Sequence, residues 1–116
     1  NDLIPATCEG IDKLKQDESR HIAYGIYLIS RLISENPELW DVAENTMNTL
    51  ITPALGVVTE AFEQYDPIPF GLNPDDFTAY AMMQFQKRYQ RIAQSRELSL
   101  DAVQAMTHDA IDQNDA

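Results

Sequence analysis

The sequence has little basic charge, a single cysteine and few glycines. Its 116 residues include eight Lys and Arg against nineteen Asp and Glu, which gives a formal net charge of −11. We expect no nucleic-acid partner, because sequence-independent binding relies on Lys and Arg to neutralise phosphates. For the same reason we expect no docking on an anionic membrane surface. An acidic protein that imitates DNA stays compatible with this composition.

The lone cysteine, Cys8, excludes an intramolecular disulfide and a zinc cage built from several cysteines. A reducing compartment is the simplest interpretation, and we expect a cytoplasmic protein. No apolar run reaches the roughly 18 residues that a membrane span needs, and no signal peptide is recognisable. The chain begins at Asn1 without an initiator Met, so we expect a processed product, an expressed fragment or a piece of a longer protein.

The low glycine content and the shortage of alternating β-branched runs predict an all-α fold in one domain. A first helix is expected from Pro5 to about Ser34, where apolar residues recur at three- and four-residue steps. These apolar residues are Ile11, Leu14, Ile22, Ile26, Ile29, Leu32 and Ile33. The pair Asn36-Pro37 should end this helix and start the next, in which Pro53 should cause a kink or a split.

Residues 65–73 contain two prolines and a glycine and predict an extended loop. The run Asn73–Asp76 predicts the start of a third helix, with a cap residue, a proline and two acids at the positive end. That helix should end near Arg96. Residues 1–98 are thus expected to be the helical part of a bundle. Residues 99–116 are expected to form an acidic C-terminal extension that is partly helical or frayed.

One group of polar residues in the first helix has a spacing typical of metal sites. Glu18 and His21 are three residues apart, so a carboxylate oxygen and an imidazole nitrogen can meet at one metal ion. Helical bundles with dinuclear iron or manganese centres use this Glu-x-x-His spacing, and iron, manganese and zinc all accept such ligands. Leu14, Gly25 and Leu28 extend the same face, and a buried acid and imidazole would need a partner there. Alternatively, the pair is a chance match, and if exposed it is only a weak polar contact.

The residues around this pair carry a longer resemblance. The stretch Gln16–Gly25 resembles the second Glu-x-x-His helix of the class I ribonucleotide reductase small-subunit superfamily, and more narrowly that of its ligand-binding oxidases. The resemblance continues through Asn36–Trp40, through Pro69–Leu72 with Asp76-Phe77, and through Gln84–Arg88. It covers about residues 5 to 95. The ordered series of blocks is more specific than the Glu-x-x-His spacing alone.

This resemblance implies a partial ferritin-like helical bundle of about three to five helices. The oxidases of this group hold a manganese–iron or di-iron centre, activate dioxygen there and bind a long-chain fatty acid against the metals. By motif position, Glu18 and His21 correspond to two ligands of the second metal. Asp17 corresponds to a carboxylate that hydrogen-bonds the histidine on the other metal, which would fix the orientation of that ring. The resemblance also implies a homodimer.

The sequence departs from this family in one large respect. The family draws four carboxylates and two histidines from four helices, and only one such helix is recognisable here. The chain therefore resembles the C-terminal portion of such an oxidase, with the other ligands expected upstream of Asn1. The isolated chain is then expected to be inactive, and no catalytic residue can be assigned.

Two alternatives stay open at this point. The chain could be a non-enzymatic acidic helical module that binds a partner through a face which the absent helices would have covered. It could also be a fragment of a ribonucleotide reductase small subunit proper. The second alternative is weaker, because the tail contains no recognisable radical-transfer peptide.

Overall fold

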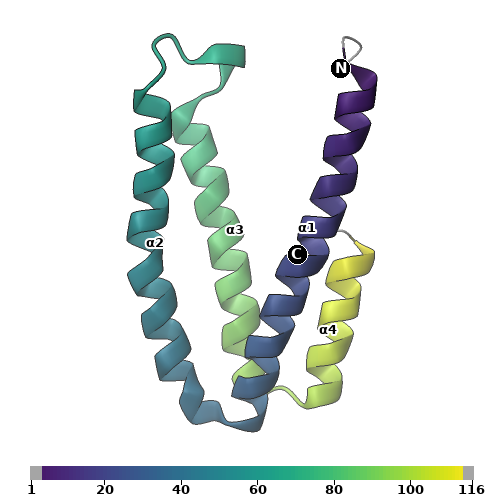
Figure 1. Ribbon diagram of the computed structural model, residues 1–116. Helices are drawn as coiled ribbons and strands as arrows, with labels where there is room; N and C mark the ends of the chain where they lie inside the picture. The colour runs from purple at the N-terminus through teal and green to yellow at the C-terminus, as the bar shows by residue number, and fades with distance from the viewer. Residues whose placement is uncertain (1–3, 114–116) are drawn as a thin grey trace.

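The computed structural model describes residues 4–113, and the chain is helical over almost all of this range (Figure 1). Its four α-helices are α1 (Pro5–Glu35), α2 (Trp40–Glu63), α3 (Pro74–Gln94) and α4 (Leu100–Asp112). Short 3-10 helices at Pro37–Leu39, Pro69–Gly71 and Ser95–Glu97 lie between them. The described residues contain no strand. The predicted all-α fold class is therefore confirmed.

The helices form two pairs that come together at one end of an elongated molecule (Figure 1). One pair is the antiparallel hairpin of α2 and α3, and the other is α4 packed along α1. The first half of α1 extends beyond these contacts. From Pro5 to Glu18 every residue is exposed except Cys8, which is half-buried. Among the described residues, no helix has the length and apolar character needed to cross a membrane.

The helix ends follow the local signals in the sequence. The long first helix ends at Glu35, directly before Asn36-Pro37. The side chain of Asn73 caps α3 by accepting hydrogen bonds from the backbone N–H groups of Asp75 (2.8 Å) and Asp76 (3.2 Å). Ser99 caps α4 in the same way through the N–H of Ala102, at 3.2 Å. The described part of the C-terminal extension is thus a regular, capped helix.

Pro53 does not split the second helix, so of the two expected outcomes, a kink or a split, the split does not occur. A single α-helix runs from Trp40 to Glu63 with Pro53 inside it. A proline at this position removes the hydrogen bond that would reach the carbonyl of Thr49. Both Thr49 and Pro53 are exposed, so water can satisfy that carbonyl and the helix continues.

The core is small and lies where the two helix pairs meet. Ile33, Trp40 and Ile92 are buried against one another, and Tyr89 packs beside them. The rings of Trp40 and Tyr89 meet edge to face, with centroids 5.3 Å apart, and the guanidinium of Arg96 lies 4.5 Å from the centre of the Trp40 ring. This arrangement makes Trp40 the anchor of the turn between α1 and α2.

A hydrogen bond lies beside the same cluster. The hydroxyl of Tyr89 donates a hydrogen bond to the carboxylate of Glu44 across the α2–α3 hairpin. This hydrogen bond is the main reason why the pKa of Tyr89 lies above its ordinary value. Tyr89 of α3 therefore contacts α2 through both its ring and its hydroxyl.

Candidate metal-binding pair on helix α1

Glu18 and His21 are neighbours on α1, as their spacing requires. Glu18 Oε2 lies 3.8 Å from His21 Nδ1, and the two side chains are 69% and 74% exposed. This distance is too long for a hydrogen bond, so the pair is held only by the helix that carries it. The expectation that the pair is buried in an apolar stripe is therefore wrong for this chain.

The reason is that the apolar residues of α1 divide between two faces. The buried residues of the helix, Ala23, Ser30 and Ile33, lie on one of them. At about 100° per residue, Leu14, Leu28 and Leu32 lie on the other, and all three are exposed. Glu18 and His21 belong to this second face, which we call the leucine face.

Gly25 lies on the leucine face one turn after His21. A Cβ atom added at Gly25 would meet no heavy atom within 4 Å. No neighbouring atom therefore fills the position of a side chain at Gly25.

Asp17 has a polar partner on its own helix. Its carboxylate accepts a hydrogen bond from Arg20 Nη1 at 3.3 Å, and both side chains are exposed. Such a surface pair contributes little to stability. The carboxylate thus remains accessible to a ligand approaching this side of α1.

The described residues fit one edge of a metal site and not a complete one. A carboxylate oxygen and an imidazole nitrogen are donors that iron and manganese accept. However, no group of three His, Cys, Asp or Glu residues is arranged to hold a metal ion anywhere between residues 4 and 113. Further donors would have to come from outside this range.

An apolar groove continues from the leucine face toward α2. Its cavity measures about 370 Å³. It is lined by Ile29, Leu32 and Ile33 of α1, by Leu39, and by Val42, Ala43, Thr46, Met47 and Leu50 of α2. Leu32 belongs to both the leucine face and the groove, so the two make one apolar surface. The sequence pattern gave no indication of this groove, because it depends on how α1 and α2 are placed.

Comparison with known proteins adds no family to this description. No protein-family model matches the chain, and no solved structure matches it either.

Proposed function

We propose that this chain is the C-terminal portion of a manganese–iron or di-iron oxidase similar to the ribonucleotide reductase small subunit. In this proposal Glu18 and His21 bind one of the two metals, and Asp17 orients a histidine on the other. The remaining ligands belong to helices outside the 116 residues. When bound, the metals would supply the activation of dioxygen in the complete, homodimeric protein.

The observation that carries the proposal is the position of the pair on the leucine face. An acid and an imidazole in the middle of exposed leucines contribute little to the fold of this chain, since their side chains are mostly in water. If further helices covered this face, both groups would lose their water. A buried carboxylate and imidazole then need hydrogen bonds, opposite charges or a metal ion.

We also propose that the complete protein binds a fatty-acid-like ligand, and the groove supports this. Ile29, at the start of the groove, follows His21 by eight residues on the same helix, which corresponds to about 12 Å along the axis. A long alkyl chain can span this distance. Its apolar tail would lie in the groove while its carboxylate lies beside the metals.

Glu18→Ala tests the assignment in the full-length protein that carries this sequence. We expect the variant to lose one of the two metals, so that metal analysis by mass spectrometry shows about half of the normal content, because the site loses an anionic ligand. Glu9→Ala is the matched control: Glu9 is an exposed acid on the same helix, paired with Lys13. Full metal content in Glu18→Ala would refute the role of Glu18.

The non-enzymatic module remains the second candidate, because the chain exposes much apolar surface. Leu14, Val42, Leu50 and Val57 are all exposed. A module would use this surface without a metal. Its partner binding would survive Glu18→Ala and treatment with a chelator, whereas Leu32→Lys would abolish it by placing a charge in the groove.

Both candidates predict that the isolated chain self-associates. Exposed apolar faces of this kind drive association in water. Sedimentation velocity should show a weight-average mass that rises with concentration, and Leu32→Lys should reduce the rise. A compact monomer at every concentration would contradict the prediction and weaken both candidates.

A further inference from the structure

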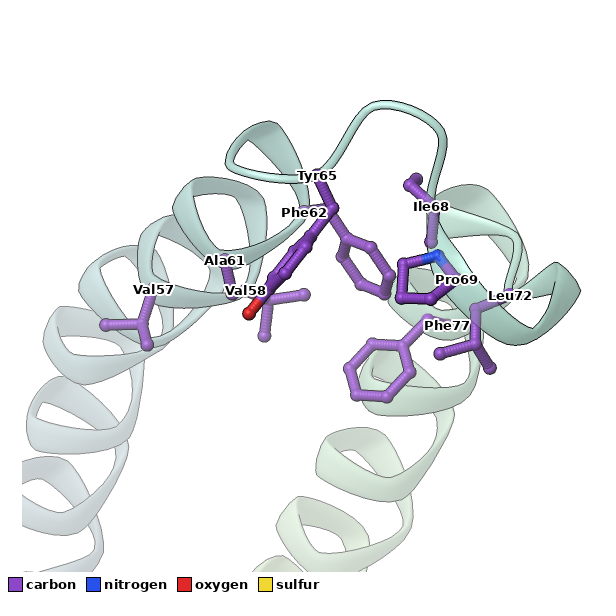
Figure 2. A pocket seen from close by; sticks show the side chains of 9 residues that line it. All are labelled: Val57, Val58, Ala61, Phe62, Tyr65, Ile68, Pro69, Leu72 and Phe77. Atoms are coloured by element: carbon purple, nitrogen blue, oxygen red, sulfur yellow. The ribbon is translucent and has the colours of Figure 1, made fainter.

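A second apolar cavity lies at the far end of the α2–α3 hairpin, where the two helices are joined. Its volume is about 290 Å³. Figure 2 shows side chains of α2 on one side and those of the connection and of Phe77 on the other, around a common opening. Phe62 and Phe77 meet edge to face, with centroids 5.3 Å apart. We call this cavity the hairpin cup.

The hairpin cup offers almost no polar group to a ligand. Val58, Leu72 and Pro69 line it together with the two phenylalanines, and the hydroxyl of Tyr65 is the one polar side-chain group among its lining residues. Apolar walls with a phenylalanine pair suit a bulky apolar side chain. At about 290 Å³ the open cup lies near the lower end of the volumes of small-molecule sites and has room for one such side chain.

Phe70 stands next to the cup and points into water. It is 96% exposed, and its backbone φ is 61°, followed by a φ of 66° at Gly71. A bulky residue in this left-handed region is strained by about 1–3 kcal/mol. The turn therefore holds a large aromatic side chain outward at an energetic cost, as is common where a protein binds a partner.

The charge around the cup has one sign. The sequence contains no Lys, Arg or His between Arg31 and Lys87, while the same stretch holds nine Asp and Glu. Glu60 and Glu63 lie in the last turn of α2, where the negative end of the helix dipole adds to their charge. Asp75 and Asp76 lie at the positive end of α3, which offsets part of theirs.

Acidic groups also lie directly beside the cup. A hollow of about 300 Å³ shares Phe62 and Ile68 with the cup and is lined further by Glu63 and Asp75. A ligand with an apolar group in the cup would thus place its neighbouring groups near two carboxylates. This arrangement favours a cation and disfavours a fatty acid or any other anion.

We propose that the hairpin cup and the adjoining acidic hollow bind a segment of a partner protein in which a bulky apolar side chain is flanked by Lys or Arg. The apolar side chain fills the cup beside Phe62 and Phe77, and the basic side chains face Glu63 and Asp75. Phe70 adds an apolar contact at the rim. This inference is independent of the metal centre, since it uses no residue of α1.

Three short peptides separate the parts of this proposal. The 116-residue chain, labelled with ¹⁵N, is titrated with acetyl-Lys-Lys-Phe-Lys-Lys-amide and followed by two-dimensional NMR. The comparison peptides replace either the four lysines by glutamate or the phenylalanine by glycine. We expect the Lys/Phe peptide to shift amides of residues 57–77 and to bind about tenfold more tightly than either comparison peptide.

A charge-neutralising variant tests the hollow without disturbing the cup. The double variant Glu63→Gln, Asp75→Asn should weaken binding of the Lys/Phe peptide about fivefold. Glu9→Gln, Asp12→Asn is the matched control, because it removes the same charge from the exposed first half of α1 and should have little effect. Added salt should weaken binding to the unmodified chain.

Other occupants of the cup would give different results. Equal binding of the glutamate peptide would overturn the proposal, and so would equal binding of the glycine peptide, which would indicate charge attraction alone. Shifts at residues 57–77 that depend on protein concentration without peptide would identify a second copy instead. Tighter binding of 4-phenylbutan-1-ol than of the Lys/Phe peptide would identify a small-molecule site.

Discussion

Replacing Trp40 by alanine is expected to unfold the chain or bring it close to unfolding. Trp40 is 6% exposed and packs against Ile33 and Ile92, the other members of the central cluster. Removing a buried tryptophan costs about 3–5 kcal/mol, against a total of roughly 5–15 kcal/mol for an ordinary domain. Few other apolar side chains between residues 4 and 113 are buried, so little remains to compensate.

The measurement is urea unfolding followed by far-ultraviolet circular dichroism. The midpoint for Trp40→Ala should fall strongly, or the helical signal should be reduced before urea is added. Tyr80→Ala serves as the control, because Tyr80 is an exposed aromatic residue on α3, and its midpoint should change little. An unchanged midpoint in Trp40→Ala would mean that this cluster is not the centre of stability.

The helices could be predicted from sequence because their ends are set by local chemistry. Asn73 caps α3 through its own side chain, and Asn36-Pro37 ends α1 without help from distant residues. At Pro53 the local rule left a kink and a split open, because the surroundings of the proline decide whether the helix continues. The position is exposed, so water can satisfy the carbonyl that loses its hydrogen bond to the proline.

The packing of α1 could not be predicted in the same way. Apolar residues lie on more than one side of this helix, and the spacing rules identify a face without saying what covers it. The structure buries the side with Ala23 and Ile33 and leaves Leu14 and Leu28 in water. Which side is buried depends on α3 and α4, whose positions no spacing within α1 specifies.

The Glu18–His21 pair and the hairpin cup also differ in how far each depends on local sequence. Glu18 and His21 form a local pair, and their spacing alone predicted that they share a face. The hairpin cup joins Val58, Leu72 and Phe77 from three segments of the chain, so it exists only in the folded hairpin. The one available signal was the long stretch without a basic residue between Arg31 and Lys87, which includes the whole of this end of the hairpin.

Val103→Asp is expected to detach α4 from α1. Val103 has no exposed surface. Helix α4 packs along α1, and Ala110 of α4 and Ala23 of α1 line one small hollow between the two helices. An uncompensated buried carboxylate costs roughly 3–5 kcal/mol, so α4 should leave α1 to bring the new charge into water. The amides of residues 100–112 should then lose protection from hydrogen exchange by a factor of about 100 or more.

Ala105→Asp is the matched control, since it places the same charge on an exposed position of the same helix and should leave exchange unchanged. The start of α4 stays tethered, because Ser34 Oγ donates a hydrogen bond to the carbonyl of Leu98 at 2.6 Å. If α2 and α3 keep their protection in Val103→Asp, α4 is a separate cooperative unit laid onto α1. If they lose it as well, α4 completes the core, because the buried side of α1 then depends on this helix to stay folded.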